Sequence, residues 1–287
     1  MPRHSRKRAM AAASSHDSPE SDPVKGAGDS FARKACLSEA HTTSTGFSPV
    51  VVSSVAYIGT IASFLIASLV PGLPKLPFPV VGCMVTANSG KFGVWQPGAH
   101  TIFMGLYVAH FIRRTLEVLF VHRFKRRMSL TETLGAPVYY WTFGFWAGWA
   151  LRPDLGYINT HIAIFSVGIV IFIFGEVGNC TAHIQLRMLR SGTTEGRQSS
   201  LSSGHVIPRS LLFSLVSCPH YTCEIISWLG FFLATWTLNG ALFLVATIIT
   251  LTVYSHKHHR RYKEEFDGRD GRELYPKVRK ALIPFIF

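Results

Sequence analysis

The sequence predicts an all-α, polytopic membrane protein with six or seven transmembrane helices, and three observations support this fold class. Of its 287 residues 48% are hydrophobic and only 16% are charged, which argues against an ordinary water-facing surface. Five apolar stretches are each about long enough to cross, or nearly cross, the roughly 30 Å hydrocarbon layer. Lys and Arg gather near the ends of these stretches, which is typical of multi-spanning proteins. The stretches are 50–70, 101–121, 134–151, 158–178 and 225–254.

Ahead of these stretches, residues 1–46 mix Ser, Pro, Gly, Thr and both charges without periodicity. Such a segment cannot bury enough apolar area to offset ordering, so we expect a disordered cytosolic tail before a membrane domain over 47–287. The first apolar stretch, 50–70, is expected to act as a signal anchor for insertion into the endoplasmic reticulum. A transit peptide in the basic, Ala- and Ser-rich residues 1–16 is the weaker alternative.

Proline interrupts the chain after the first stretch and makes 71–79 a loop. A weaker apolar segment follows at 80–87, and whether it spans the membrane is left open. The helix expected over about 100–121 is apolar but carries ionisable side chains. Such groups are costly at membrane depth and usually face a polar cavity, a partner or the interface. They are His100, His110, Arg113, Arg114 and Glu117.

The remaining stretches predict the later helices. An aromatic-rich span at 136–151 is followed by another from 158, which runs into polar residues at Glu176. Thirty residues, as in 225–254, exceed one perpendicular crossing. We therefore expect a break at Asn239–Gly240 that divides this stretch into two shorter helices.

The net charge of +13 would also suit a nucleic-acid-binding protein, but its distribution favours a membrane topology. Seven of the 29 Lys and Arg lie in residues 1–46 and nine in residues 256–287. We therefore expect membrane lipid as a partner, no nucleic acid, and a cytosolic N-terminal tail and C-terminus. The basic cytosolic side would suit an anionic ligand that carries phosphates.

Polar residues recur in steps of three and four along the end of the fourth stretch, at positions 176, 179, 183, 187 and 190. This spacing places them on one face of a helix. The amide, imidazole and guanidinium groups of Asn179, His183, Arg187 and Arg190 can donate to phosphate and ribose oxygens. The alternative is a helix that leaves the bilayer with a solvated face.

A second polar cluster, with His220, Tyr221 and Glu224, immediately precedes the last long apolar stretch. At the mouth of a membrane cavity these side chains can supply a proton donor, a hydrogen-bond donor and an acceptor that orients them. A buried phenol is neutral at pH 7 yet can stabilise a developing enolate. The alternative is a set of interfacial residues that anchor a helix.

A third cluster, His256 to Tyr262, precedes a charged tail. Clustered histidines beside a membrane raise the question of a di-iron site, but no two of the 13 histidines are four residues apart. The five cysteines form no CxxC pair. We therefore expect no metal, and interpret the cluster as an anion-binding element or a topology signal.

In this order, the three clusters resemble the steroid 5α-reductase superfamily of NADPH-dependent membrane reductases, and most closely its very-long-chain trans-2-enoyl-CoA reductases. The resemblance covers about residues 101–287. It includes a motif R-x-L-E-T-L-F-V-H-[KR]-F, a motif G-N-x-x-x-H-x-x-L-R-x-L-R and a motif V-S-C-P-N-Y-x-x-E. The matching segments are Arg114–Phe124, Gly178–Arg190 and Val216–Glu224, and the ending Lys280–Phe287 is similar to both branches.

The resemblance implies that 47–287 is a membrane reductase domain that holds NADPH in a cytosol-facing cavity. Tyr221 matches the catalytic tyrosine of the enoyl reductases and Arg123 the position of an important basic residue. Glu117 belongs to the same motif as Arg123, and these three are the expected catalytic residues. The expected cofactor-binding residues are Asn179, His183, Arg187, Arg190, His220, Glu224, His258 and Tyr262.

Two departures from the family pattern bear on the substrate. His220 stands where the family has Asn, and no Asp or Glu occurs between Val50 and Leu116. The superfamily carries a glutamate in its first membrane segment, near the position that Ala56–Tyr57 occupies here. Steroid reductases use that acid to polarise a ketone, so its replacement weakens a steroid interpretation.

The implied reaction is hydride transfer to the β carbon of a 2-enoyl thioester, followed by protonation at the α carbon. It would complete each cycle of very-long-chain fatty-acid elongation in the endoplasmic reticulum. The implied partners are a long-chain acyl-CoA and the elongase, ketoacyl reductase and dehydratase of that cycle. The alternatives are a reductase of a Δ4-3-ketosteroid or another isoprenoid enone, and a catalytically silent membrane scaffold.

Overall fold

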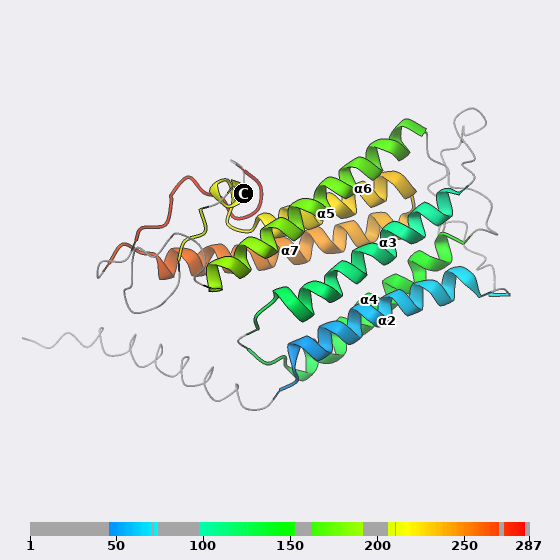
Figure 1. Cartoon of the computed structure of the whole chain (residues 1–287), viewed down its shortest axis with the longest axis horizontal. Coiled ribbons are helices and arrows are strands. Elements are labelled where there is room, and N and C mark those ends of the chain that lie inside the picture. Colours follow the sequence, from blue (N-terminus) through cyan, green and yellow to red (C-terminus); the bar gives the residue numbers. More distant parts are fainter. Residues whose placement is uncertain are drawn as a thin grey trace, which may run out of the picture. The chain divides into compact units, whose positions relative to one another are not determined.

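The structure, a computed structural model, describes residues 46–70, 72–73, 98–124, 126–152, 162–191, 206–209, 211–269 and 273–284. Within these ranges the chain is helical, apart from isolated β-bridges, which confirms the predicted all-α class (Figure 1). Residues 1–45 and the segment 80–87 lie outside the described residues, so their predicted roles stay predictions. The elements are α2 (Pro49–Leu69), α3 (Ala99–Leu116), η2 (Glu117–Val121), α4 (Leu130–Ala150), α5 (Ile162–Ser191), η4 (Leu211–Ser214), α6 (Pro219–Thr235) and α7 (Leu238–Glu265).

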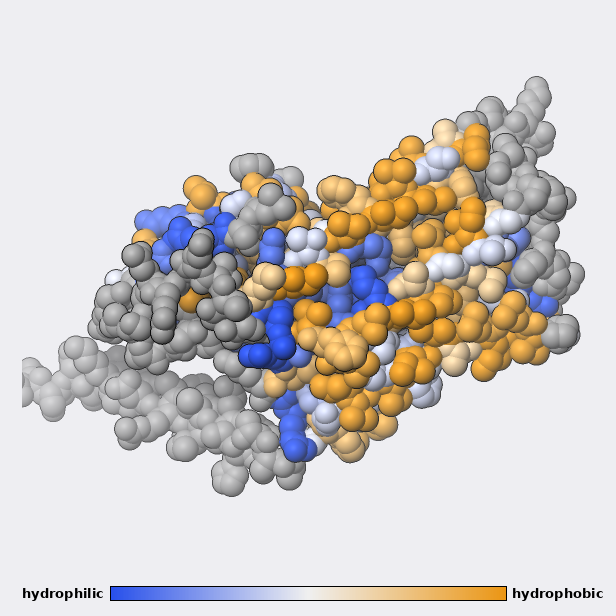
Figure 2. Space-filling view, in the orientation of Figure 1, coloured by the Kyte–Doolittle hydropathy of each residue, from blue (hydrophilic) through white to orange (hydrophobic). Residues whose placement is uncertain are grey.

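Three of the described helices are long and apolar enough to cross a membrane: α2, α5 over Ile162–Leu189, and α7. Large apolar side chains stand exposed along these helices and α4, among them Ile58, Val138, Phe174 and Ile249. Figure 2 shows the result as a mostly apolar surface over the helices. A surface of this kind suits lipid contact better than water.

The last long apolar stretch is divided where α6 gives way to α7. Trp236 takes a left-handed conformation with φ of 49° and ends α6. The Thr237 hydroxyl then accepts a hydrogen bond from the Gly240 amide at 3.3 Å and caps α7. The predicted break is confirmed, slightly before Asn239–Gly240.

Small residues bring two pairs of helices into close contact, α2 with α4 and α5 with α6. A methyl group at Gly148 of α4 would collide with the Phe64 carbonyl of α2, and one at Gly175 of α5 with the Ser227 amide of α6. Glycine therefore allows backbone approach that any larger residue would prevent, as is common between membrane helices. Helix α3 lies between the two pairs in Figure 1 and packs aromatic rings against both.

The C-terminal segment fixes the start of α6. The Ser217 and Cys218 amides donate to the carbonyls of Lys280 and Ala281 at 2.8 and 3.1 Å. One turn into α6, the Thr222 hydroxyl donates to the Leu282 carbonyl at 2.6 Å. These bonds hold the first turn of α6, which carries two of the predicted site residues, His220 and Tyr221.

Candidate active site

Two side chains of α3, together with Glu117 directly after it, meet three side chains of α5 in register. The pairs are His110 Nδ1 with Glu176 Oε1 at 2.8 Å, Arg113 Nη1 with Asn179 Oδ1 at 2.8 Å, and Glu117 Oε2 with His183 Nδ1 at 2.9 Å. Each pair is separated by 66 residues in the chain, so the two helices run in the same direction with matched spacing. The stripe predicted along the end of the fourth stretch is therefore buried against a second polar stripe and is not a solvated face.

Glu117 is the centre of this contact. Its carboxylate accepts hydrogen bonds from Arg113, from Arg114 at 2.6 Å and from His183, and its side chain is 3% exposed. Burial of these charges is tolerable only because each has an opposite partner. Because the carboxylate is so fully engaged, the structure gives Glu117 a role in positioning two guanidinium groups, and its catalytic role stays a prediction.

The turn after α3 is a π-helix, η2, which begins at Glu117. The His122 amide closes this wider turn by donating to the Glu117 carbonyl at 2.7 Å. One guanidinium nitrogen of Arg187 lies 3.5 Å from the Val121 carbonyl, again 66 residues away. Wider turns of this kind are frequent at functional sites. Here the turn lets the pairing of α3 with α5 continue to Arg187.

Helix α6 joins the same cluster through Asn179 and Glu224. The Asn179 amide donates to the His220 carbonyl at 2.7 Å while its oxygen accepts from Arg113. Glu224 Oε1 lies 3.5 Å from His110 Nε2 and accepts from the Trp228 indole at 3.1 Å. We call the whole cluster the polar seam. It consists of His110, Arg113, Arg114, Glu117, Glu176, Asn179, His183 and Glu224.

The polar seam contains buried atoms that form no hydrogen bond with the described residues. They are Arg113 Nη2 and Glu224 Oε2, which form an ion pair 3.9 Å apart, and, next to the seam, His220 Nδ1. Unpaired buried donors and acceptors are costly and rare, so such a group indicates a place for water or a ligand. Figure 2 shows hydrophilic residues in the otherwise apolar face, between α5 and α3, the two helices that the seam joins.

Tyr221 lies beside the seam in the first turn of α6. Its ring centroid is 4.2 Å from that of His220 and 6.0 Å from that of His258 on α7. Among the residues that the structure describes, none hydrogen-bonds the Tyr221 hydroxyl. Because His220 carries the carbonyl that Asn179 bonds, Tyr221 and Asn179 belong to one site.

Helix α2 contributes a tyrosine that the sequence did not assign to the site. The Arg114 guanidinium lies 5.6 Å from the Tyr57 ring centroid and 3.4 Å from its hydroxyl oxygen. Tyr57 lies in the pair Ala56–Tyr57, near which the sequence comparison expected the family's acid. A phenol therefore stands at the edge of the polar seam, where it can donate a hydrogen bond but carries no charge.

Other predicted residues lie away from the seam. Arg123 and His258 are exposed, and Tyr262 stacks on Tyr275 with ring centroids 5.5 Å apart. The side chain of Arg190 lies outside the described part of the chain. The structure thus unites Glu117, Asn179, His183, His220 and Glu224, with Tyr221 and Arg187 adjacent.

A group of donor atoms from Glu117, His122 and His183 lies within 4.8 Å, a spacing that a metal ion could bridge. One nitrogen of Arg114 already lies 3.2 Å from His183 Nδ1 and 2.6 Å from Glu117 Oε2. The guanidinium supplies the positive charge that a metal would bring, and it would repel one. We therefore assign no metal to this group.

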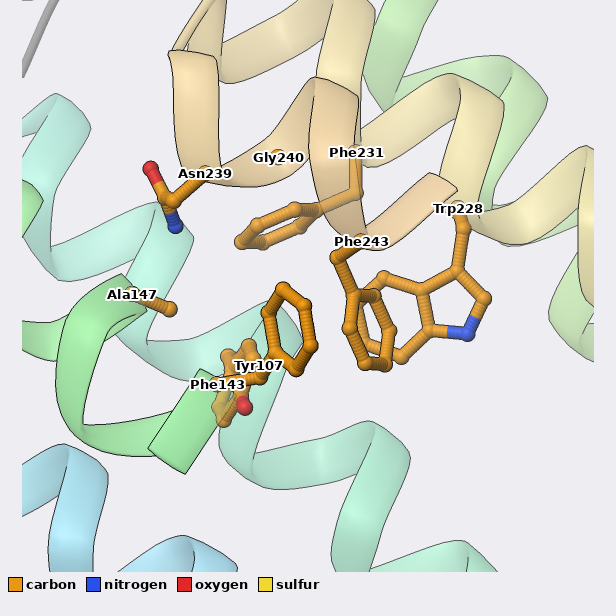
Figure 3. A pocket seen from close by; sticks show the side chains of 8 residues that line it. All are labelled: Tyr107, Phe143, Ala147, Trp228, Phe231, Asn239, Gly240 and Phe243. Atoms are coloured by element: carbon orange, nitrogen blue, oxygen red, sulfur yellow. The ribbon is translucent and has the colours of Figure 1, made fainter. Parts of the chain in front are cut away.

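An aromatic pocket lies further along the helices, between α3, α4, α6 and α7 (Figure 3). The enclosed space among these side chains has room for about one water molecule, because the surrounding hollow of about 240 Å³ includes open space at its mouth. Trp228 connects it to the polar seam, because the same indole that lines the pocket donates to Glu224. The lining residues are Tyr107, Phe143, Ala147, Trp228, Phe231, Asn239, Gly240 and Phe243.

Comparison with known families decides the relationship. The family of 3-oxo-5-alpha-steroid 4-dehydrogenases matches residues 126–287. The chain belongs to this family. The resemblance found in the sequence motifs is confirmed, and with it a multi-pass membrane protein. The match includes α5, α6 and α7, whereas the α3 half of the polar seam precedes it.

Individual relatives fall into two groups. The chain is 37% identical over 190 residues to a very-long-chain enoyl-CoA reductase of Dictyostelium discoideum, covering 66% of this chain and 58% of that protein. It is 32% identical over 184 residues to a probable very-long-chain enoyl-CoA reductase of Caenorhabditis elegans, covering 62% and 56%. It is 31% identical over 237 residues to 3-oxo-5-alpha-steroid 4-dehydrogenase 2 of Mus musculus, covering 77% and 85%. The match thus spans less than two thirds of the enoyl-CoA reductases.

Membership of the family does not by itself assign the α3 residues of the seam, and the sequence did not place Arg113, Arg114 or His110 in the site. A signal was available. His110, Arg113 and Glu117 repeat the three-and-four spacing of the α5 stripe with opposite chemistry at each step. Two such stripes on apolar helices indicate a shared buried interface.

Proposed function

We propose that the chain reduces the 2,3 double bond of a trans-2-enoyl-CoA with NADPH, completing cycles of very-long-chain fatty-acid elongation in the endoplasmic reticulum. One observation carries the proposal: a polar seam with buried groups that lack hydrogen bonds adjoins an aromatic pocket through Trp228. The first can hold a polar cofactor, and the aromatic side chains that line the second would have to move apart to admit an apolar chain. The enoyl-CoA reductases of Dictyostelium discoideum and Caenorhabditis elegans among the relatives favour this substrate class.

The seam suits the amide end of a nicotinamide nucleotide. His220 Nδ1, Arg113 Nη2 and Glu224 Oε2 are buried without hydrogen bonds. The last two form an ion pair 3.9 Å apart, which a carboxamide could bridge because it both donates and accepts hydrogen bonds. Asn179 and His183 would hold the same end of the cofactor from α5. NADPH, when bound, supplies the hydride.

The phosphates of the cofactor would bind further toward the end of α5. Within the seam two guanidinium groups already face three carboxylates, those of Glu117, Glu176 and Glu224, so the seam has no excess positive charge for an anion. Arg187 lies past this region, near η2. Arg190 would follow it, and His258 and Tyr262 would approach from α7.

Tyr221 is the residue that we propose to handle the proton. Its hydroxyl could deliver a proton to the α carbon or polarise the thioester carbonyl, and both roles need a neutral phenol near the pocket. The absence of a described hydrogen-bond partner leaves the hydroxyl available to a substrate. Arg123, which is exposed, would act on the acyl-CoA from outside the seam.

The test is a substrate panel on membranes that express the wild type, Tyr221→Phe and a control, Tyr254→Phe, whose ring lies exposed on α7. With NADPH and trans-2-hexadecenoyl-CoA we expect Tyr221→Phe to lose about 10²–10⁴ in kcat while NADPH binding persists. Tyr254→Phe should retain wild-type turnover. An unchanged kcat in Tyr221→Phe would remove this residue from the mechanism.

A second candidate is the reduction of a Δ4-3-ketosteroid or another isoprenoid enone, which the murine relative favours because the match covers 85% of it. Turnover of testosterone but not of the enoyl-CoA would reverse the ranking. Tyr57, in place of the family's acid, would then polarise the ketone.

Purified protein that binds no NADPH would favour a silent scaffold. Elongation enzymes stay proposed partners under the first function alone.

A further inference from the structure

Asn239 is a polar residue in an otherwise apolar part of the aromatic pocket. It is 2% exposed, and its Oδ1 atom is buried without a hydrogen-bond partner among the described residues. Figure 3 shows its side chain on the first turn of α7, next to Phe231, with the amide nitrogen directed toward Ala147 and the oxygen away from it. A buried amide with an unpaired acceptor is destabilising unless something binds it.

The amide is not needed to begin α7. Thr237 caps the helix by accepting from the Gly240 amide, and its hydroxyl also lies 3.2 Å from that of Thr235. Asn239 makes no hydrogen bond in this network. A leucine of similar size at this position would fill the same space without an unpaired polar atom. The position of the amide therefore points to a ligand rather than to the fold.

Asn239 lies at the end of the pocket that is remote from the polar seam. The near end is Trp228, which bonds Glu224, and the far end follows Thr235, where α6 stops. The 11 residues from Glu224 to Thr235 extend about 16 Å along α6 at 1.5 Å per residue. A substrate whose double bond lies at the seam would bring its other end to Asn239.

We propose that Asn239 makes this end of the pocket a polar subsite that binds a hydroxyl or carbonyl group at the end of the substrate remote from the reduced double bond. An amide both donates and accepts, so it can pair with either group. This inference rests on the proposed function for the orientation of the substrate. A hydroxylated acyl chain of the length of hexadecanoyl would reach from the seam to Asn239, whereas a steroid with an oxygen on its last ring is shorter and would have to bind deeper in the pocket.

The experiment measures binding of product-like ligands that are not turned over, with the full chain purified in lipid nanodiscs. One pair is hexadecanoyl-CoA and 16-hydroxyhexadecanoyl-CoA, and the other is 5α-androstan-3-one and its 17β-hydroxy derivative. We expect the wild type to bind the hydroxylated member of one pair about tenfold more tightly. The pair that shows this preference identifies the source of the hydroxyl.

Asn239→Leu should abolish the preference and bind both members equally, or favour the apolar one. Ser54→Ala is the matched control, because it removes another buried unpaired oxygen, on α2 and outside the pocket lining. This control should keep the wild-type ratio. Thermal unfolding of each variant shows whether it is folded before its ratio is used.

Equal binding of both members by the wild type in both pairs would overturn the inference, and so would a preference that survives in Asn239→Leu. Failure of the proposed reaction is distinguishable from these outcomes. Selective binding that depends on Asn239, without any NADPH-dependent turnover, would support the subsite and reject the reductase activity. Turnover without selective binding would support the reductase activity and reject the subsite.

Discussion

The two faces of α5 differ in how they meet their neighbours. One face carries Gly168 and Gly175 and lies against α6 so closely that a methyl group would strike backbone atoms. An adjacent face carries Glu176, Asn179 and His183, whose side chains reach across to α3, while the Asn179 amide also donates to the His220 carbonyl of α6. One helix therefore takes part in a backbone-to-backbone contact on one face and in a wider, charged contact on the neighbouring face.

The two contacts have different roles: the close contact with α6 is structural, and the charged contact with α3 is where a ligand can bind. Close contact of small residues leaves no room for water or ligand, so it fixes α6 and its Tyr221 relative to α5. The charged contact is held by long side chains, and two of its buried atoms, on Arg113 and Glu224, form an ion pair 3.9 Å apart but no hydrogen bond. Such a contact can exchange partners with a ligand without moving a helix. The site is thus built at a wide interface that a tight one supports.

The largest expected effect comes from adding a side chain where α5 and α6 are in closest contact. In Gly175→Val the new side chain would meet the Ser227 amide and, at 2.7 Å, the Cys223 carbonyl, neither of which can move without moving α6. We expect a loss of more than about 4 kcal/mol in the free energy of unfolding, and no folded protein. Size-exclusion chromatography of the solubilised variant measures this.

Gly105→Ala is the control for that variant. Gly105 lies on α3, and no described atom lies within 4 Å of a Cβ placed there. Since alanine favours a helix over glycine by about 1 kcal/mol, this variant should fold as well as the wild type or better. If Gly175→Val folds, α5 and α6 are not in close backbone contact, and the difference between this contact and the α5–α3 contact does not hold.

The second effect concerns the charged face. Glu117→Ala would leave the Arg113 and Arg114 guanidinium groups buried with one carboxylate fewer. Removing one partner of a buried ion pair costs about 3–5 kcal/mol, which thermal unfolding would register as a large fall in Tm. Glu264→Ala, at an exposed pair with Arg260, should cost less than about 1 kcal/mol. Equal losses in the two variants would show that the seam is open to water.

Much of this architecture could be predicted from the sequence, because single helices carry their own signals. Apolar length predicted the helices, and the excess length of 225–254 predicted the break that the structure has at Trp236. The spacing of Glu176, Asn179 and His183 predicted a shared face, since that geometry is local to one helix.

What could not be predicted depends on which helices are neighbours. The contact of Tyr57 with Arg114 joins α2 to α3 and has no signature in either segment. The glycine face of α5 became meaningful only once α6 was known to lie against it. Arg123 was expected in the site from its motif, yet it is exposed, because the chain leaves the helix after η2.

The smallest expected effect concerns the exposed ion pair of Glu132 with Arg126, which can be compared with the buried pairs of Glu117. The pKa of the Glu132 carboxyl is lowered to about 2, chiefly by the hydrogen bond from Arg126 and, against burial, by bonds from Ser129. A lowered folded pKa stabilises the protein fully above the ordinary value of 4.5, and this stability is lost as the pH falls toward 2.

Glu132→Gln removes the charge of this side chain but keeps its place in the capping box with Ser129, since glutamine can also accept from the Ser129 amide. At pH 7 the variant's free energy of unfolding should be lower than that of the wild type by less than about 1 kcal/mol, since the pair is exposed. Its Tm should therefore be slightly lower. The difference in Tm should shrink as the pH falls from 4.5 toward 2, and also as salt is added. A difference that stays constant over this range would mean that the charge of Glu132 contributes nothing. The contrast between buried and exposed pairs would then rest on Glu117 alone.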